Sequence, residues 1–373
     1  MISVLFLIPT LDRGGAENVL VDLVNHMDQS KFQITVHTLF DKDSQKDKLS
    51  SGIEYRSFMY NQFHGNSRLQ ALLPARLLYR LIVGKRYDIV VSYLEGPASH
   101  ILSGCPYKDT KKVAWFHSAF TRGRGFRAGF VSISQAIRAY RGFDMIVFVA
   151  QTVKEAIEKT ADIWFDRSCI LYNTINNADI LAKAREPLLG SPFYDKEFNI
   201  LSTGKIAYVK GYDRLARIQK KLIDAGYKTH VYILGAGPEQ KKIETYLQEN
   251  RLSENFTFLG FQENPYRFVS KADLFVCSSR REGFSTAVTE ALVLGVPVVS
   301  TNCSGAYELL GENNEYGLVT ENSEEALYEG IKRLLDNPEL LEHYKNQARE
   351  RGKMFSTEKT VKAVEDMLLG MSQ

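Results

Sequence analysis

The most constraining stretch of the sequence runs from Ser278 to Pro297, because it has the pattern of a loop and a helix between two buried strands. The runs before and after it (272–277 and 296–301) are short, mostly apolar and rich in strand formers, as buried parallel strands are. Between them, Ser285 or Thr286 can cap a helix. The stretch therefore predicts a strand–loop–helix–strand unit of a parallel α/β sheet.

The N-terminus of this expected helix lies at the carboxyl end of a strand, where open parallel sheets bind ligands. The unpaired N–H groups of a first helical turn favour an anion. Glu282 lies just before the helix, and Glu290 lies inside it, roughly 9 Å along the axis from Phe284. A diphosphate on the helix N-terminus could have a sugar hydroxyl bound by Glu282 and a ribose bound by Glu290. Spacing alone is equally typical of a solvated helix face.

The form E-G-F-x5-E-A, which begins at Glu282, resembles the signature of retaining glycosyltransferases of family 4. The resemblance extends through most of the chain and is strongest in its second half. It implies an α/β protein of the GT-B fold, in which two Rossmann-like domains face a central cleft. The expected parts are an acceptor-binding domain (1–176), a linker (177–196), a nucleotide-sugar-binding domain (197–355) and a C-terminal helix that crosses back to the first domain (356–373).

Length and composition agree with two globular domains. The 373 residues are 44% hydrophobic and 24% charged, which allows two cores of ordinary size. The cysteines form no C-x-x-C pair, which predicts buried thiols in a reducing compartment; they are Cys105, Cys169, Cys277 and Cys303. The N-terminus lacks a basic leader, and no apolar run reaches the roughly 20 residues of a membrane span. We therefore expect a cytoplasmic protein.

Positive charge is concentrated in the first half of the chain. Through Ile175 there are 22 basic and 16 acidic residues, whereas the remainder has 25 and 28. No acidic residue lies between Asp109 and Asp144, where seven basic residues occur: Lys111, Lys112, Arg122, Arg124, Arg127, Arg138 and Arg141. This asymmetry favours an anionic partner. Nucleic-acid binding has only this basic patch in its favour, so we expect no nucleic-acid partner.

Two further segments of the first half bear on partners. The range 68–85 has the pattern of a basic amphipathic helix, which either packs on the sheet or also contacts an anionic membrane surface peripherally. The loop 120–130, with arginines among aromatic residues and glycines, could meet a lipid-phosphate acceptor.

Two positions of the first domain are candidate site residues. Gly14 and Gly15 follow the first expected strand, and glycines at such a turn let backbone amides approach a ligand. The resemblance places this loop beside the donor phosphates and the acceptor. His117 ends the expected strand 112–117, a position more often filled by a packing residue. The resemblance implies that His117 contacts the transferred sugar from the domain opposite the donor.

The second domain supplies the other candidates. The range 204–211 resembles the family motif G-R-x4-K-G, whose Arg and Lys grip the donor diphosphate. Lys205 stands at the position of that Arg, so a single ammonium replaces a guanidinium that can bind a phosphate with two hydrogen bonds. Lys210 matches the Lys of the motif. The G-x-G-P at Gly235 lacks the third glycine of a dinucleotide fingerprint, which disfavours a dehydrogenase. Phe261 follows the strand where the family seats the nucleotide base.

The resemblance assigns two overlapping sets of residues. Donor binding falls to Gly15, Lys205, Lys210, Gly237, Phe261, Glu282, Gly283, Phe284, Ser285 and Glu290. Catalysis falls to Glu282, His117 and Lys210. The D-x-D at Asp41 and Asp43 resembles the metal motif of another glycosyltransferase fold, but it lies in a solvated loop, so we expect no metal.

The expected reaction is retaining transfer of a hexosyl group from a nucleoside diphosphate sugar to a saccharide hydroxyl in cell-surface polysaccharide synthesis. Two lysines and a helix N-terminus can stabilise the departing diphosphate without a cofactor. Resemblance to capsule, exopolysaccharide and lipopolysaccharide enzymes suggests a UDP-hexose donor and a polyprenyl-diphosphate-linked acceptor. The alternatives are a sugar-nucleotide epimerase of similar fold and a non-catalytic GT-B partner subunit. The latter would be expected to lose the cation or the first glutamate.

Overall fold

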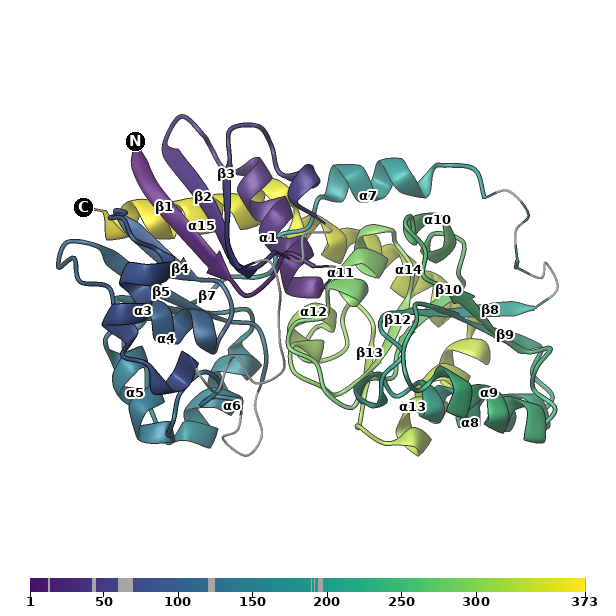
Figure 1. The fold of residues 1–373 in the computed structure, drawn as a ribbon. Helices are drawn as coiled ribbons and strands as arrows, with labels where there is room; N and C mark the ends of the chain where they lie inside the picture. Colours follow the sequence, from purple (N-terminus) through teal and green to yellow (C-terminus); the bar gives the residue numbers. More distant parts are fainter. Residues whose placement is uncertain are drawn as a thin grey trace. The chain divides into compact units, whose positions relative to one another are not determined.

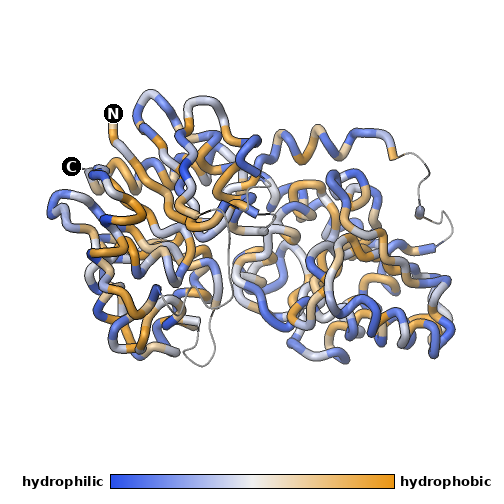
Figure 2. The backbone as a smooth tube through the Cα atoms, in the orientation of Figure 1, coloured by the Kyte–Doolittle hydropathy of each residue, from blue (hydrophilic) through white to orange (hydrophobic). Residues whose placement is uncertain are grey.

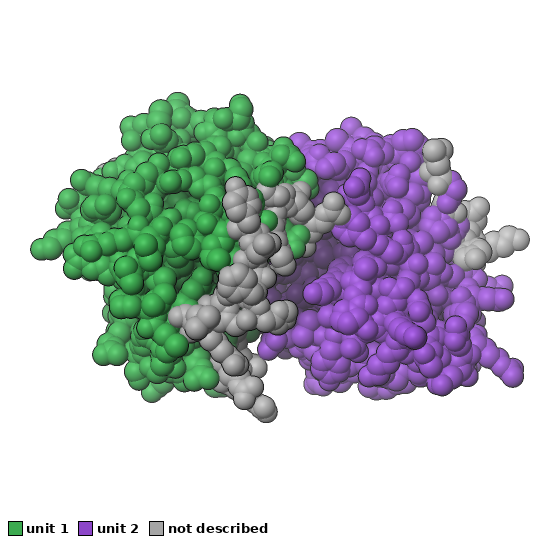
Figure 3. Space-filling model, viewed as in Figure 1, with its two compact units in different colours: residues 1–175, 357–373 green, residues 176–356 purple. Residues whose placement is uncertain are grey.

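The computed structural model describes the chain apart from residues 13, 42–44, 60–69, 120–124, 189, 191, 194–196 and 373. The described residues form two compact units, coloured separately in Figure 3. Unit 1 comprises residues 1–175 and 357–373, and unit 2 comprises residues 176–356. Each unit contains one parallel sheet (Figure 1). Within the described ranges, no helix is both long enough and apolar enough to cross a membrane.

The sheet of unit 1 has seven strands in the order β3-β2-β1-β4-β5-β6-β7. The strands are β1 (Ile2–Ile8), β2 (Phe32–Phe40), β3 (Glu54–Met59), β4 (Ile89–Ser92), β5 (Lys111–Phe116), β6 (Met145–Phe148) and β7 (Ser168–Ile170). Figure 2 shows that hydrophobic residues predominate along its central strands. The direction of winding reverses between β1 and β4, so this unit has a topological switch point at the carboxyl edge of its sheet.

The helices of unit 1 that lie wholly within the described residues are α1 (Gly15–His26), α3 (Ala75–Ile82), α4 (Pro97–Ser103), α5 (Ile133–Arg141), α6 (Gln151–Ala161) and α15 (Thr357–Met371). The single helix expected over 68–85 is wrong, because the helical residues 70–72 are separated from α3 by a break at Leu73 and Pro74 and α3 ends at Ile82. Proline lacks an N–H donor and disfavours helical geometry in the residue before it. Arg68 lies outside the described residues.

Helix α15 returns to unit 1, as the GT-B fold requires. It packs against α1. The Asp28 backbone N–H donates a hydrogen bond to Glu365 Oε1 over 2.6 Å, and Thr357 Oγ1 donates to the Ile175 carbonyl over 2.8 Å. The C-terminal helix is therefore part of the first unit although it follows the second in sequence.

The sheet of unit 2 has six strands in the order β10-β9-β8-β11-β12-β13. The strands are β8 (Phe198–Thr203), β9 (Thr229–Leu234), β10 (Phe256–Gly260), β11 (Leu274–Cys277), β12 (Val298–Thr301) and β13 (Leu318–Thr320). The main helices are α7 (Asn177–Ala184), α8 (Tyr212–Asp224), α9 (Gln240–Glu249), α10 (Tyr266–Val269), α11 (Thr286–Val293), α12 (Ala306–Leu310), α13 (Glu324–Leu335) and α14 (Pro338–Gly352), with the short 3₁₀ turn η2 (Tyr208–Lys210). The two sheets and the returning helix confirm the predicted fold class.

Two details differ from the expectations. The segment 177–196 was expected as a linker, but it contains α7 and is grouped with unit 2. The four cysteines are free thiols, yet only Cys277 is buried, because Cys169 lies on the edge strand β7 and Cys105 and Cys303 lie in loops.

Candidate active site

Two loops meet at the carboxyl edge of the unit 2 sheet, because they follow the neighbouring parallel strands β8 and β11. Lys210 Nζ lies 2.6 Å from Glu282 Oε1, and Ser279 Oγ donates to the same oxygen over 2.5 Å. Burial lowers the pKa of the Lys210 ammonium, but the facing Glu282 carboxylate more than offsets this, and the net shift is upward. Lys210 is therefore a fixed cation at the edge where a ligand is expected.

Helix α11 begins beside this pair as the sequence predicts. Ser285 is its N-cap, whose Oγ accepts a hydrogen bond from the Val288 N–H over 3.4 Å. Gly295, with φ 71°, follows the last turn, and the left-handed conformation there ends the helix. Phe284 is 5% exposed, and its ring packs edge-on against Phe355. Its side chain therefore belongs to the core of unit 2.

Arg280 joins the loop after β11 to the loop that carries Lys210. Its Nη1 and Nη2 donate to Asp213 Oδ1 and Oδ2 over 2.6 and 2.7 Å, and Nη1 also donates to the Tyr208 carbonyl. The guanidinium lies 4.0 Å from the centre of the Tyr208 ring. The Arg280 backbone N–H donates to the Val209 carbonyl over 2.7 Å. Arg280 thus holds the loop after β8 and the loop after β11 together beside the Lys210–Glu282 ion pair.

Gly211 permits the two loops to lie this close. Its φ is 69°, and a Cβ there would lie 2.1 Å from the Ser278 carbonyl oxygen. Ser278 Oγ in turn donates to the Lys210 carbonyl over 2.8 Å. Any larger residue at 211 would separate the loops and misplace Lys210.

Arg280 was missed from sequence, because an arginine in a polar loop is ordinarily solvated. Ser278 and Ser279 immediately before it are buried in the structure, but the sequence itself carried no signal that this loop is packed. Burial raises the pKa of its partner Asp213, but hydrogen bonds and charge from Arg280 and Arg217 outweigh this and lower the pKa to about 2.

We expect Arg280→Met to lower the free energy of unfolding by about 1–2 kcal/mol at pH 7, since bonds to a partly screened charge are lost. The folded pKa of Asp213 lies below its unfolded value, so the pair stabilises the fold above about pH 4 and loses this contribution as pH falls toward 2. The difference in the free energy of unfolding between wild type and variant, measured by denaturant titration, should therefore become smaller as the pH is lowered from 5 to 3.

The neighbouring Arg281 is exposed and supplies the matched control for this experiment. Arg281→Met should change stability by no more than about 0.5 kcal/mol at either pH. Equal destabilisation by the two variants, or a difference that does not depend on pH, would show that the Arg280–Asp213 contact does not hold the loops.

The remaining candidates of unit 2 lie at several points of its sheet edge. Glu290 Oε1 accepts a hydrogen bond from the Tyr266 hydroxyl over 3.4 Å. A Cβ on Gly237 would lie 2.2 Å from the Ile206 carbonyl, so the loop after β9 rests on the loop after β8. Phe261 is 55% exposed beyond β10, and Lys205 is exposed. The structure brings Lys210 and Glu282 into contact, while Lys205 stands in the solvent.

His117 and Gly15 belong to unit 1. Gly15 is the first residue of α1, and Gly14 is the N-cap. The His117 N–H donates to Glu95 Oε2 over 3.0 Å, and its ring lies 4.8 Å from the Tyr93 ring. Burial lowers the pKa of His117 to about 3, against the opposing bond to the Tyr93 backbone. The imidazole is therefore neutral near pH 7.

Glu95 is a second functional candidate that sequence reasoning missed. Burial raises the pKa of its carboxyl, although hydrogen bonds from the His117 backbone and the Ser118 side chain oppose the rise. Glu95 follows β4 as His117 follows the adjacent β5, so adjacency at one sheet edge was the available signal. Through its hydrogen bond with the His117 N–H, Glu95 fixes the backbone at the position of His117.

Within the described ranges, no group of three or more His, Cys, Asp or Glu side chains could hold a metal ion. Asp43 of the D-x-D pattern lies outside the described residues, and Asp41 lies just after β2.

Two family models match successive parts of this chain. The model described as Glycosyltransferase Family 4 matches residues 13–179, and the one described as Glycosyl transferases group 1 matches residues 190–351.

Curated relatives align with about half of the chain. The N-acetylgalactosamine-N,N'-diacetylbacillosaminyl-diphospho-undecaprenol 4-alpha-N-acetylgalactosaminyltransferase of Campylobacter jejuni is 35% identical over 205 residues, which are 54% of this chain and 53% of the relative. The capsular polysaccharide biosynthesis glycosyltransferase CapM of Staphylococcus aureus is 28% identical over 41% of each chain. The aligned segments thus span about half of these relatives or less.

Solved structures match along the whole chain. Anabaena HepE in complex with UDP has a TM-score of 0.79 at 18% identity, with 99% of this chain and 100% of that chain covered. The lipopolysaccharide outer core galactosyltransferase WaaB has a TM-score of 0.72 at 16% identity, with 99% of each chain covered. Likeness at this level of identity concerns the fold, and it confirms the predicted GT-B architecture.

Proposed function

Because this chain belongs to glycosyltransferase family 4, we propose that it transfers a hexosyl group, with retention, from a nucleoside diphosphate sugar to a saccharide hydroxyl in cell-surface polysaccharide synthesis. The observation that carries the proposal is the Lys210–Glu282 pair beside the N-terminus of α11. A UDP-hexose donor is supported by the similar structures that contain UDP and UDP-glucose. A lipid-linked acceptor is supported by the name of the Campylobacter relative.

The proposed chemistry breaks the bond between the anomeric carbon and the diphosphate and forms a bond to the acceptor oxygen. Negative charge develops on the departing diphosphate, and the acceptor proton passes to one of its oxygens. Lys210 and the first-turn N–H groups of α11 can stabilise this charge, because they are already oriented before the donor arrives. Lys205, being exposed, would add a second and weaker cation.

Glu282 and His117 are the two residues proposed to contact the transferred sugar. Glu282 Oε1 is occupied by Lys210 and Ser279, so Oε2 would take a sugar hydroxyl. For His117 we propose hydrogen bonding to the transferred sugar as a neutral imidazole. A neutral ring adds no positive charge near a sugar that becomes cation-like, so its low pKa suits this role.

Donor binding and turnover can be tested together. A donor that binds only the folded state stabilises it by about 2.7 kcal/mol at a hundredfold excess over Kd, which for units of this size is a rise in Tm of roughly 5–10 °C. We expect a UDP-hexose to give this rise among a panel of nucleotide sugars. Addition of a lipid-linked saccharide should then release UDP. This release should persist in EDTA, because the lysines stabilise the departing diphosphate in place of a divalent ion.

Three results would contradict the proposal. If no nucleotide sugar in the panel raises Tm, the proposed donor site is wrong. Conversion of the nucleotide sugar without an acceptor would favour the epimerase. Loss of turnover in EDTA with rescue by magnesium would point back to a metal-dependent mechanism and to Asp41 and Asp43.

A further inference from the structure

Two cysteines of unit 2 lie together beside the proposed donor site, and the proposed reaction uses neither of them. Cys277 is the last residue of β11, and Cys303 lies in the loop that follows β12. These strands are neighbours, with Cys277 paired to Ser300, so both chain segments leave the sheet at the same edge. The Cys303 thiol forms a hydrogen bond with the Cys277 thiol. Two thiols in direct contact are a candidate site of oxidation.

Cys277 also contacts the polar network of the donor site. Its sulfur lies 3.7 Å from Ser279 Oγ, which in turn donates to Glu282 Oε1 over 2.5 Å. The hydrogen bond from Cys303 has the largest influence on the pKa of Cys277 and lowers it. Burial and Glu282 raise this pKa, Lys210 lowers it, and the net shift is downward. Cys277 is therefore the sulfur of the pair that reacts as a thiolate.

The Cys303 side of the pair is open to a small oxidant. Cys303 is partly exposed, whereas Cys277 is 6% exposed. The hydrogen bond to Cys277 raises the pKa of Cys303, and burial adds to this shift, so Cys303 stays protonated beside the thiolate. A reactive thiolate with a second thiol in contact is the arrangement found in redox-sensing proteins.

The loop that carries Cys303 supports the chain just before α11. A Cβ on Gly305 would lie 3.0 Å from the Gly283 carbonyl oxygen, so the two segments are in close contact. Gly283 directly follows Glu282, and the cap of α11 comes two residues later. A disulfide is shorter than a contact between two thiols, so its formation would draw this loop toward β11 and shift the support of Glu282. A misplacement of about 1 Å in an active site can cost roughly a hundredfold in rate.

We propose that Cys277 and Cys303 form a reversible disulfide on oxidation and that this disulfide inactivates the neighbouring donor site. With hydrogen peroxide, the Cys277 sulfur takes one oxygen as a sulfenic acid and releases water. The Cys303 sulfur then displaces that oxygen as a second water, so two thiols are oxidised and one peroxide is reduced. A thiol reductant restores both cysteines by exchange. Formation of the disulfide is independent of the proposed function, whereas its effect on the donor site rests on that function.

The test is treatment of the full chain with diamide, which takes two hydrogens from a pair of thiols and transfers no oxygen. Mass mapping of the non-reduced chain should find the peptides of Cys277 and Cys303 joined. Turnover should fall at least about tenfold, because the support of Glu282 has moved. The Tm rise with a nucleotide sugar should become smaller, and dithiothreitol should restore both quantities.

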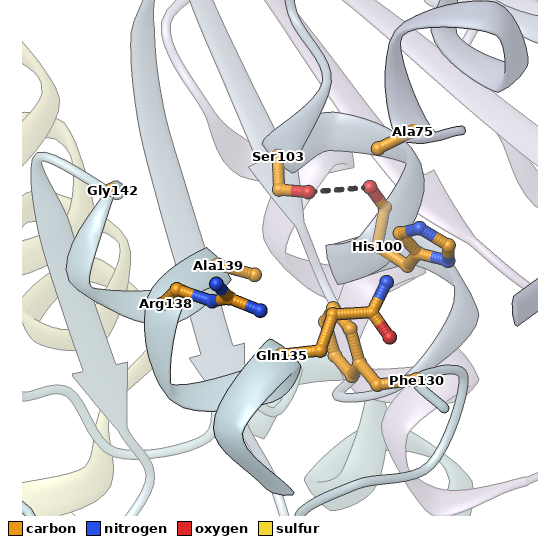
Figure 4. Close-up of a pocket in the computed structure, with 8 residues that line it drawn as sticks. All are labelled: Ala75, His100, Ser103, Phe130, Gln135, Arg138, Ala139 and Gly142. Carbon is orange, nitrogen blue, oxygen red and sulfur yellow. Dashed lines mark hydrogen bonds between the residues drawn. The ribbon is translucent and has the colours of Figure 1, made fainter. Parts of the chain in front are cut away.

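Cys303→Ser and Cys105→Ser form the matched pair. Both cysteines are partly exposed, but Cys303 contacts Cys277, whereas Cys105 belongs to unit 1. Cys105 comes two residues after Ser103, which borders the cavity between α4 and α5 shown in Figure 4. In diamide, Cys105→Ser should form the disulfide and lose turnover as the wild type does. Cys303→Ser should do neither, and its Tm and turnover before oxidation should equal those of the wild type.

Three results would overturn the proposal. The first is a wild-type chain in which diamide does not join Cys277 to Cys303. The second is a disulfide that leaves both turnover and the Tm rise unchanged. The third is a loss of turnover in Cys303→Ser that dithiothreitol reverses. A reduced chain that binds no nucleotide sugar would instead contradict the proposed function, and the mass mapping would still decide whether the disulfide forms.

Discussion

Lys210→Ala should lower turnover roughly 10²–10³-fold and leave unit 2 folded. This is the scale observed when one preorganised charge-stabilising donor is removed from an active site. The side chain is about a quarter exposed, so its ammonium is desolvated enough to act strongly on a departing diphosphate and open enough to reach it. Steady-state kinetics with a verified donor, beside a thermal melt, measure both parts of this prediction.

Lys205→Ala provides the comparison in the same loop. Lys205 is exposed, and an exposed charge contributes on the order of 1 kcal/mol or less, so its loss should slow turnover no more than about fivefold. Near-normal turnover of Lys210→Ala, or a larger effect from Lys205→Ala, would remove Lys210 from the proposed role and make Lys205 the principal cation.

Glu282→Gln should lower kcat strongly while the affinity for UDP stays the same or rises. A carboxylate on the transferred sugar helps to place the anomeric carbon, so its loss appears in kcat. The structure adds that Glu282 is also the counterion of Lys210, so its neutralisation frees the lysine for a diphosphate. Glu290→Gln should instead raise the donor KM and weaken UDP, because a ribose contact holds ground and transition states alike.

Calorimetry with UDP, beside steady-state kinetics, separates these two glutamates. Each variant serves as the control of the other, since both change one carboxylate at the ends of the same loop and helix. If both lose UDP affinity equally, the assignment of the sugar to Glu282 and of the ribose to Glu290 is wrong.

The parts of the fold predicted best from sequence are those in which local chemistry and burial agree. The stretch from Ser278 to Pro297 has a serine cap and a terminating glycine and lies between two apolar strands, and the structure has each of these features. Strand β3 was missed because it is a half-exposed edge strand, and β13 was missed because three residues carry too little pattern.

The site was predictable only as far as it rests on residues near one another in sequence or on a known motif. Lys210 and Glu282 were each assigned to the donor site from a motif, but their contact was not predicted, and it arises in the structure because β8 and β11 are neighbours. Arg280 and Glu95 were not predicted, because their importance depends on partners that only the tertiary structure brings near: Asp213 in one case, and the His117 backbone in the other. A sequence shows that a charge exists, but its partner and its desolvation are properties of the packing.

The ion pair between Lys210 and Glu282 also bears on which anions can bind at this sheet edge. A simple anion such as inorganic phosphate gains little from Lys210, because the carboxylate 2.6 Å away already neutralises the ammonium. A ligand that brings both an anion and hydroxyl groups can bind Lys210 and Glu282 Oε2 at once. We therefore expect that, without substrate, the Glu282 carboxylate competes with simple anions for Lys210 and weakens their binding at this site.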